Sequence, residues 1–435
     1  MAETMRRNFD VLVVGAGPAG LAAATSAARV GAKVGVVDDN PAVGGQIWRG
    51  EVSKATSDAS NWAAKLHSLG VEVICGAQIV HHDIASRVLF AETRFALLEI
   101  RFSKLILATG ARERLLPFPG WTLPNVMAAG GLQAMVKSGL PISGKRVVVA
   151  GSGPLLLAVA AYLRAHGAKV LAICEQASWN SLASFASGLL SHPGKLRQAL
   201  ILQRQLLGIP FWTNSWPVRA LGREALERII ISRNGTQREI SCDYLACGFH
   251  LVPNVELASL LGCALEGGCV RVDDAQQTSV AGVFCAGEPT GIGGLELALI
   301  EGQIAGIAAA GKSERLRELR GRRRKAQQFA RRLEKAFKLR PELKTLPDSG
   351  TIVCRCEDVT HARLARHSSW RDAKNQTRCG MGPCQGRICG PATQFLFDWD
   401  PGSVRPPLFP TRVESLASVS YIAPAEHSQL TGERQ

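Results

Sequence analysis

The chain has 435 residues, of which 46% are hydrophobic and 20% charged, an ordinary globular composition with room for about three domains. Its formal net charge of +15 is concentrated in one basic segment, so it does not describe a basic surface throughout. These numbers therefore give no support to a nucleic-acid-binding protein.

Neither a membrane span nor a signal peptide is expected. No uninterrupted apolar run reaches the ~18–20 residues that cross a bilayer, and residues 1–7 lead straight into a predicted strand. The sequence thus predicts a cytoplasmic protein, and in that reducing compartment the 12 cysteines are not expected to form a disulfide framework. Metal or redox use is the better interpretation where they cluster.

The first predicted elements are a strand, a glycine turn, a helix and a second strand. Apolar residues 11–14 precede the Gly-x-Gly-x-x-Gly sequence of residues 15–20, and an alanine-rich helix is expected at 21–28. A short second strand, residues 33–37, ends at Asp38. Three glycines followed by an acid about 20 residues later are the fingerprint of a dinucleotide site. A plain strand–helix turn explains neither the three glycines nor the acid.

Each residue type in this fingerprint has a physical role. Gly15 makes the tight turn, Gly17 lets the backbone approach a pyrophosphate, and Gly20 lets the helix pack closely on the strand. The start of the helix offers free N–H groups to phosphates, and Asp38 can accept hydrogen bonds from ribose hydroxyls. The predicted contacts in this stretch are Gly15, Gly17, Pro18, Ala19, Gly20, Asp38 and Asp39.

Two further segments are expected at the same site. A Pro- and Gly-containing loop at residues 40–47 follows the second strand, where Gly45 and Gln46 are predicted contacts and a flexible turn is the alternative. Residues 70–102 read as strands. Another buried strand then ends at Thr109 and Gly110, which are also predicted contacts.

The opening arrangement recurs near the middle of the chain. Residues 146–154 form a strand and a glycine turn, an apolar helix follows, and residues 167–175 give a second strand and an acid. Leu156 stands where the third glycine would be, so the helix should approach the strand less closely. Gly151 and Gly153 are predicted contacts for NAD(P) or ATP, and the alternative is a retained scaffold without nucleotide.

The chain then returns to the first fold. A strand ends at Cys285-Ala286-Gly287-Glu288, and glycines lead into a helix at residues 295–310. Glycines before a helix N-terminus suit a phosphate or an anionic ring edge. Gly287 and Glu288 complete the predicted cofactor contacts.

These motifs, in this order, resemble the two-dinucleotide-domain flavoproteins that include thioredoxin reductase. The resemblance covers roughly residues 8–311. It implies an α/β fold with FAD in the first domain and a Gly-Asp pair on the ribityl chain. In this sequence that pair is Gly287-Glu288, one methylene longer, so the contact should be shifted. No Cys-x-x-Cys pair lies in this part of the chain, so disulfide reduction is not expected.

A basic segment follows at residues 311–344. Ala326, Phe329, Ala330 and Leu333 fall at helical spacing and give a basic helix an apolar stripe. The segment is interpreted as a linker helix with a solvated basic face, and docking of an acidic partner is the alternative. No aromatic platform accompanies it, so nucleic acid is not expected as a partner.

Five cysteines gather after this helix. Cysteine thiolates hold iron–sulfur clusters, usually four of them. The Cys-x-Cys pair and the Gly-Met-Gly-Pro-Cys-Gln-Gly-Arg-Ile-Cys run resemble the [2Fe-2S] domain of bacterioferritin-associated ferredoxin. By that match the ligands are Cys354, Cys356, Cys384 and Cys389, whereas Cys379 takes a place usually held by a small residue. Cys379 and Cys384 have the same separation as Cys384 and Cys389, so replacement of a ligand by Cys379 stays open. A tetrahedral zinc site is the alternative.

The predicted domain organisation has five parts. Residues 1–118 with 251–311 form a discontinuous FAD domain and 119–250 a second dinucleotide domain. A basic helical linker at 312–348, a [2Fe-2S] domain at 349–395 and an extended tail at 396–435 follow.

The whole arrangement resembles the A (α) subunit of opine oxidases and the matching subunits of hydroxyproline dehydrogenase and hydrogen cyanide synthase. That resemblance implies an electron-transfer subunit of a dehydrogenase for an amino or imino acid. The implied partner is an FAD-dependent β subunit of the D-amino-acid-oxidase type. Also left open are an FMN at a subunit boundary and a small ferredoxin-like γ subunit.

Two rival functions stay open. One is a stand-alone NAD(P)H-dependent reductase, and the other is a scaffold that binds a nucleotide and a cluster without turnover. No catalytic acid or base is predicted. His81 and His82 are the only adjacent histidines, and neighbouring side chains on a strand face opposite sides.

Overall fold

The computed structural model describes residues 4–51, 57–189, 192–312, 316–402 and 404–422. The described chain forms two compact units. Among the described residues, unit 1 comprises those within 4–110, 253–326 and 404–422, and unit 2 comprises those within 111–252 and 327–402. The part of the predicted tail from residue 423 onward lies outside the described residues.

Unit 1 is built on one sheet with strand order β3-β2-β1-β6-β5-β4, and β19 pairs with β6. β1 runs parallel to β2 and to β6, with Val13 opposite Val36 and Ile106, whereas β5 is antiparallel to β6. The strands are β1 (Thr4–Val14), β2 (Val34–Asp38), β3 (Glu72–Cys75), β4 (Gln78–Asp83), β5 (Val88–Glu92), β6 (Leu97–Leu107) and β19 (Val283–Cys285).

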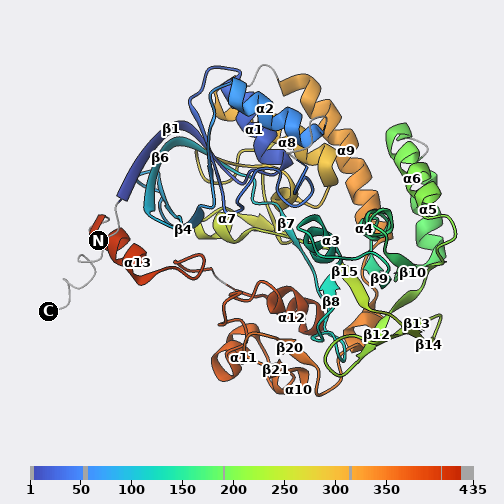
Figure 1. Cartoon of the computed structure of the whole chain (residues 1–435). Coiled ribbons are helices and arrows are strands. Elements are labelled where there is room, and N and C mark those ends of the chain that lie inside the picture. The colour runs from blue at the N-terminus through green and yellow to red at the C-terminus, as the bar shows by residue number, and fades with distance from the viewer. Residues whose placement is uncertain (1–3, 52–56, 190–191, 313–315, 403, 423–435) are drawn as a thin grey trace. The chain divides into compact units, whose positions relative to one another are not determined.

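Helices α1 and α8 pack side by side in unit 1 (Figure 1). Their close approach depends on glycines, because a Cβ at Gly302 would lie 2.1 Å from the carbonyl oxygen of Ala19, and one at Gly306 would lie 2.2 Å from that of Ala23. The helices of this unit are α1 (Pro18–Ala28), α2 (Asp58–Ser68), α7 (Glu256–Leu260), α8 (Gly294–Ala309) and α13 (Val413–Ile422). Short elements are β17 (Leu265–Glu266), β18 (Cys269–Val270) and η1 (Glu288–Thr290).

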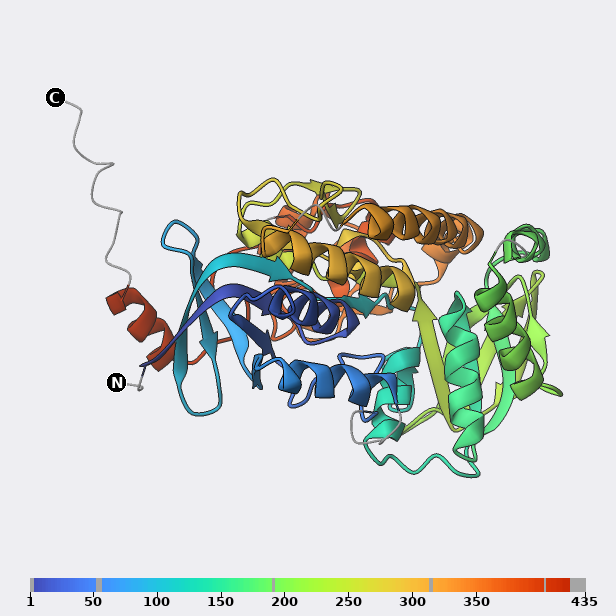
Figure 2. The ribbon, with the colours of Figure 1, turned by 90° about the horizontal axis from the view of Figure 1, so that it is seen from above.

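The described residues 404–422, which include α13, pack on the outer strands of the unit 1 sheet (Figure 2). The backbone N–H of Leu408 donates to the carbonyl of Val80 at 3.0 Å, and the Leu408 side chain enters the apolar core. Val419 of α13 is buried against Phe90. The tail therefore contributes to the core of unit 1.

Unit 2 contains the second dinucleotide-type fold, a parallel sheet with strand order β11-β10-β9-β15-β8. Val149 lies opposite Ile173 and Ala246. The strands are β8 (Val126–Ala128), β9 (Arg146–Ser152), β10 (Lys169–Glu175), β11 (Phe211–Trp212) and β15 (Tyr244–Phe249). The helices are α3 (Ala129–Lys137), α4 (Leu155–Ala165), α5 (Trp179–Leu189) and α6 (Pro193–Gln205).

An antiparallel sheet, a short ladder and the cysteine module complete unit 2. The antiparallel sheet has β12 (Ser215–Leu221), β13 (Arg228–Arg233) and β14 (Thr236–Ser241), and β7 (Ala111–Glu113) pairs with β16 (Leu251–Pro253). The cysteine module has β20 (Ile352–Cys354), β21 (Val359–Thr360), α10 (His361–Leu364), α11 (Trp370–Thr377) and α12 (Cys389–Phe397). Helix α9 (Arg317–Ala336) carries the chain from unit 1 to unit 2, and η3 (Pro341–Thr345) follows it.

Candidate cofactor sites

The first glycine turn lies between β1 and α1. Gly15 has φ +105°, and a Cβ there would lie 2.2 Å from the carbonyl oxygen of Ala108. A Cβ at Gly20 would lie 1.8 Å from the carbonyl oxygen of Gly15, so only glycine allows this helix–strand contact. Gly17 differs, because a Cβ there would find no atom nearer than 3.9 Å. Space therefore lies beside Gly17, where a pyrophosphate would approach.

The two acids after β2 have different surroundings. The buried carboxylate of Asp38 accepts hydrogen bonds from the backbone N–H of Ala16 and, at 2.7 Å, from that of Asn40. Asp38 thus holds the glycine turn to the end of β2. Asp39 is exposed as a residue, although partial burial of its carboxyl group and the neighbouring Asp38 raise its pKa. Asp39 is therefore the more accessible carboxylate for a ribose hydroxyl.

The remaining predicted contacts of the first site also follow strands of the unit 1 sheet. Gly45 lies against the turn, since a Cβ on it would be 3.0 Å from the Cα of Gly17, while Gln46 is exposed. Thr109 follows β6 and donates through its hydroxyl to the carbonyl of Asn254 at 2.6 Å, and the backbone N–H of Asn254 donates to Gly110 at 3.0 Å. Pro18 and Ala19 open α1. In open α/β sheets ligands bind beyond the carboxyl ends of the strands, and these residues share that edge.

Gly287 and Glu288 follow β19 at the same edge. Gly287 has φ +80° and its Cβ position lies 2.8 Å from the Cβ of Ala19, so the loop sits on the start of α1. The Glu288 carboxylate accepts hydrogen bonds from the N–H groups of Gly293 and Gly294, at 3.1 and 2.9 Å. Burial raises the pKa of Glu288 to about 7, although these two hydrogen bonds work in the opposite direction. In this structure the carboxylate caps the start of α8.

A buried ion pair between Glu301 and Arg323 contacts the loop that carries Gly287. Glu301 of α8 accepts hydrogen bonds from the N–H of Gly287 at 3.1 Å and from the hydroxyl of Thr290 at 2.8 Å. Its other oxygen accepts from Nε of Arg323 at 3.0 Å. Arg323 was expected on a solvated basic face, but it is only 8% exposed. The sequence carried a pattern that could have found it, because Arg323 lies three residues before Ala326, on the apolar stripe of the helix.

The second glycine motif has the geometry of the first. Gly151 has φ +136°, and a Cβ there would lie 1.8 Å from the carbonyl oxygen of Gly248. Glu175 at the end of β10 accepts hydrogen bonds from the N–H groups of Gly153 at 2.7 Å and Ala177 at 2.9 Å. Burial raises the pKa of Glu175 to about 7. Leu156, in place of the third glycine, is buried in the core of this fold.

A segment of the chain itself lies across this second motif. The hydroxyl of Ser152, within the glycine turn, donates to the carbonyl of Phe337 at 3.1 Å. The amide of Gln176, next to Glu175, donates to the carbonyl of Lys338 at 3.2 Å and accepts from the N–H of Arg340 at 3.2 Å. In dinucleotide folds the pyrophosphate lies over the turn and the ribose near the acid. The segment 337–340 bridges these two positions, and sequence reasoning missed it.

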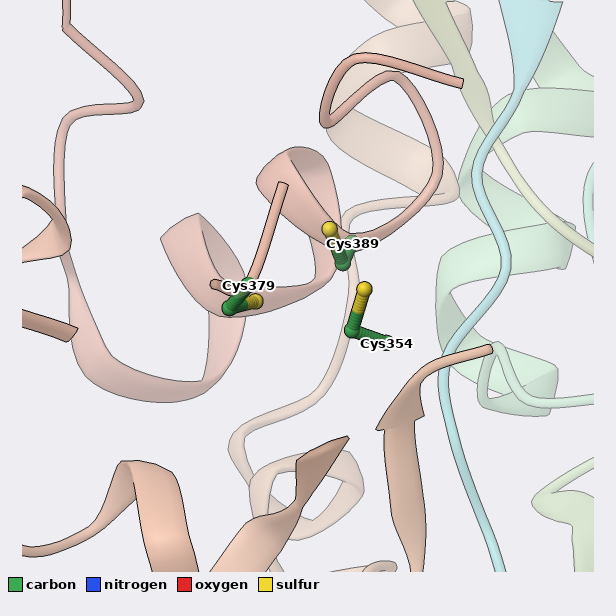
Figure 3. A group of neighbouring side chains, drawn as sticks. All are labelled: Cys354, Cys379 and Cys389. Atoms are coloured by element: carbon green, nitrogen blue, oxygen red, sulfur yellow. The ribbon is translucent and has the colours of Figure 1, made fainter. Parts of the chain in front are cut away.

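The cysteine module brings its thiols together. Cys354 ends β20, Cys389 begins α12, and their Sγ atoms and that of Cys379 lie within 4.8 Å of one another. Figure 3 shows these three cysteines as neighbours, with the sulfur of Cys354 directed towards Cys389 and the sulfur of Cys379 directed towards the other two. Cys384 hydrogen-bonds to Cys389 and to the exposed Cys356, so all five cysteines form one connected group. Hydrogen bonds from Cys379 and Cys389 lower the pKa of the Cys354 thiol.

A cavity of about 240 Å³ opens on four of these cysteines. Its lining includes Cys354, Cys356, Cys384 and Cys389, the four predicted ligands, but not Cys379. A single water needs only ~10–15 Å³ of such space, so there is room for a group of several atoms. The thiolate donor set and this volume fit an iron–sulfur cluster, and a Cys₄ zinc site shares the same donors.

Arginine and tryptophan border the cavity. Arg355 lines it and lies 5.6 Å from the ring of Trp121, whose indole N–H donates to the carbonyl of Ile352 at 2.6 Å. Arg378, by contrast, pairs with Glu357 at 2.8 Å. Of these two arginines, Arg355 is the one that lines the cavity. Trp121 was not predicted, because it is distant in the sequence from the cysteines.

No helix of the described residues is long and apolar enough to cross a bilayer. All 12 cysteines of the chain lie in the described residues as free thiols. His81 and His82 lie on β4, with ring centroids 6.0 Å apart.

Comparison with known proteins gives a consistent set of relatives. Residues 9–313 match the family model described as pyridine nucleotide-disulphide oxidoreductase. The A (α) subunit of opine oxidase from Rhizobium meliloti (strain 1021) is 32% identical, covering 94% of this chain and 99% of that protein. Hydrogen cyanide synthase subunit HcnB of Pseudomonas aeruginosa is 30% identical, covering 88% of this chain and 91% of that protein. The predicted resemblance to this flavoprotein family and to the subunits of opine oxidase and hydrogen cyanide synthase is confirmed.

Solved structures support the fold. L-proline dehydrogenase from P. horikoshii superposes with a TM-score of 0.66 at 18% identity, covering 96% of this chain and 81% of that one. Thioredoxin reductase from T. acidophilum gives 0.53 at 20% identity, covering 71% and 99%. The predicted α/β fold with Rossmann-like dinucleotide-binding domains is confirmed.

Proposed function

Because the chain belongs to the pyridine nucleotide-disulphide oxidoreductase family and is related along nearly its whole length to the A (α) subunit of opine oxidase, we propose that it is the electron-transfer subunit of an amino- or imino-acid dehydrogenase. As a member of that family it is a flavin-dependent oxidoreductase. The proposal adds a [2Fe-2S] cluster to the flavin.

One observation carries the proposal: a cavity lined by Cys354, Cys356, Cys384 and Cys389 lies in a chain that also has a dinucleotide site. Thiolates are the ligands of such clusters. When bound, a flavin accepts electrons in pairs and a [2Fe-2S] cluster accepts them singly. Arg355 at the cavity offsets negative charge there, which favours reduction of a bound cluster.

The residues of the proposed flavin site have different roles. Gly15 and Gly20 set the turn, Gly17 leaves space for the pyrophosphate, and Asp39 is accessible to a ribose hydroxyl. Gly287 closes the loop on the start of α1. Pro18, Ala19, Asp38, Gly45, Gln46, Thr109, Gly110 and Glu288 complete the proposed set.

The relatives are named as subunits, so we propose that this chain also works in an assembly. The proposed partner is an FAD-dependent β subunit of the D-amino-acid-oxidase type that oxidises an opine, hydroxyproline, proline or glycine-type substrate. An FMN at a subunit boundary belongs to the same proposal, as does a small ferredoxin-like γ subunit. Free cysteines suit the reducing cytoplasm, where we place the protein.

The first experiment tests the cofactors. The full chain is purified anaerobically after expression with iron supplied, and its visible spectrum, iron, zinc and acid-labile sulfide are measured. We expect a flavin spectrum together with equal amounts of iron and sulfide. Cys384→Ser should lose iron and sulfide but keep the flavin. Cys174→Ser is the control, because Cys174 is buried outside the cysteine module, and it should keep the iron, the sulfide and the flavin. Zinc without sulfide would refute the cluster.

The second experiment tests the division of labour. The chain is assayed for oxidation of amino and imino acids with an artificial electron acceptor, alone and with the proposed β subunit. We expect turnover only in the complex. Strong turnover by the isolated chain would contradict a transfer-only role.

The rival NAD(P)H reductase depends on Gly151 and Gly153 as a nicotinamide nucleotide site. The segment 337–340 lies across that motif through Ser152 and Gln176. This contact favours the transfer subunit over the rival.

A further inference from the structure

We propose that Cys379 does not bind iron but donates a hydrogen bond to ligand sulfurs and thereby raises the reduction potential of the cluster. The Sγ atoms of Cys354, Cys379 and Cys389 lie within 4.8 Å of one another, yet Cys379 does not line the cavity that the other cysteines share. The inference rests on the proposed function, because it presupposes a cluster bound by Cys354, Cys356, Cys384 and Cys389.

The burial of Cys379 limits what its thiol can contact. Cys379 is 0% exposed and packs in an apolar core with Val353, Leu364 and Trp370. Its backbone N–H donates to the hydroxyl of Thr377 at 3.2 Å. In Figure 3 its sulfur faces the sulfurs of the two neighbouring cysteines. The thiol of Cys379 is hidden from solvent, and these two sulfurs lie close to its S–H group.

The chain turns sharply on both sides of this residue. Arg378 has φ 65° and Gly380 has φ 82°, so the backbone is left-handed before and after Cys379. A Cβ at Gly380 would lie 2.6 Å from the ring of Trp370, which packs against the turn. This packing constrains the backbone that carries the Cys379 thiol.

A donor here acts on the redox equilibrium. A thiol carries one S–H donor, and a reduced cluster carries more negative charge on its sulfurs than an oxidised one. A hydrogen bond to those sulfurs therefore stabilises the reduced form more and raises the potential. The competing role is that of a small apolar residue that fills the core. Serine separates the two roles, because it keeps a donor at nearly the same size.

The test compares variants of the full, cluster-loaded chain. Iron and sulfide content, the visible spectrum and the midpoint potential are measured for the wild type, Cys379→Ala and Cys379→Ser. Cys242→Ala is the control, because Cys242 is also 0% exposed in unit 2 but lies outside the cysteine module. We expect Cys379→Ala to keep iron and sulfide at the wild-type level but to have a lower midpoint potential. We expect Cys379→Ser to have a midpoint potential close to that of the wild type. Cys242→Ala should leave the potential unchanged.

Other outcomes overturn the inference in distinguishable ways. Loss of iron and sulfide from folded Cys379→Ala would make Cys379 a ligand, and an unchanged potential would leave it a packing residue. If Cys379→Ala does not fold, Cys379→Val carries the same prediction with a larger apolar side chain. A wild-type chain without iron and sulfide would refute the proposed function, and the inference would fall with it.

Discussion

Nε of Arg323 lies 3.0 Å from Oε1 of Glu301, and both side chains are almost fully buried in unit 1. Glu301 also accepts a hydrogen bond from the N–H of Gly287, in the loop proposed to hold the flavin. Burial raises the pKa of Glu301, while Arg323 opposes that shift. The arginine therefore favours the ionised form of a buried carboxylate next to the cofactor loop.

Removing this arginine should destabilise unit 1. Arg323→Met leaves a buried carboxylate without its partner, which costs about 3–5 kcal/mol in comparable cases. We expect that loss in urea unfolding and weaker retention of FAD. Arg324→Met is the control, because the side chain of Arg324 is 73% exposed. Glu301→Gln combined with Arg323→Met should recover part of the stability; if it recovers none, the pair is not the source of the effect.

Alanine substitutions at Gly17 and Gly20 should have different effects, one on FAD binding and the other on folding. A Cβ at Gly20 would overlap the carbonyl of Gly15, so Gly20→Ala should prevent folding of unit 1. Gly17 has φ −75° and open space, so Gly17→Ala should fold with unchanged thermal stability in the apo form. It should bind FAD at least tenfold more weakly, about 1.4 kcal/mol, as measured by flavin fluorescence. Normal FAD affinity in folded Gly17→Ala would argue against a pyrophosphate at this position.

Local pattern predicts sites that a short stretch of chain builds, and the structure shows the geometry of those stretches. The fingerprint at residues 15–20 stands out because its spacing reflects backbone geometry, and the cysteines near residue 384 stand out through their resemblance to a known cluster domain. Arg323 was missed because one arginine in a basic run looks like its neighbours, and burial depends on Glu301 in another helix.

The contact between the segment 337–340 and the second glycine motif could not be predicted from the sequence, for a different reason. Ser152 and Phe337 are 185 residues apart, and a carbonyl acceptor carries no residue type that a sequence pattern can show. The sequence therefore left the choice between nucleotide site and scaffold open.

The segment 337–340 should keep NAD(P)H from the second motif. We expect no bleaching of the flavin by NADH or NADPH under anaerobic conditions, and no change in amide exchange at residues 337–340 on adding either. Ser152→Ala with Gln176→Ala removes three hydrogen bonds that these side chains make to the segment, worth about 1 kcal/mol each, so exchange of this segment should quicken roughly a hundredfold. Ser178→Ala is the control, because the hydroxyl of Ser178 hydrogen-bonds to Ser181 and not to the segment. Flavin bleaching by NADPH in the wild type would contradict the prediction.

Glu175 should make unit 2 less stable as the pH rises. Its folded pKa is raised by burial from 4.5 to about 7, so between these values the folded chain holds a proton that the unfolded chain has released. Stability is then fully present below pH 4.5 and falls by roughly 3 kcal/mol as the pH rises past 7. Glu175→Gln should unfold in urea without this slope, while Glu224→Gln, an exposed carboxyl, should retain it. Identical slopes for all three proteins would exclude Glu175 as the cause.

The tail should detach from unit 1 at low pH. Oε1 of Glu92 accepts hydrogen bonds from the backbone N–H and Nε of Arg412 at 3.2 and 3.1 Å, and from the hydroxyl of Ser415. Partial burial of the Glu92 carboxyl acts to raise its pKa. The hydrogen bonds from Ser415 and Arg412 outweigh burial and lower the pKa of Glu92 below its ordinary value. The contribution of Glu92 is therefore present above its unfolded pKa and is lost as the pH falls through the lower folded value.

Amide exchange of residues 405–419, corrected for its intrinsic pH dependence, measures this release. In the wild type we expect protection at neutral pH and its loss as the pH falls below the ordinary glutamate value of 4.5 and through the lower folded pKa of Glu92. Arg412→Ala should lose protection already at neutral pH, because Glu92 and the carbonyls of Thr93 and Arg94 lose their donor. Arg405→Ala, an exposed arginine in the same tail, should behave as the wild type. Protection in Arg412→Ala equal to that of the wild type would show that the apolar contacts of Leu408 and Val419 suffice to hold the tail.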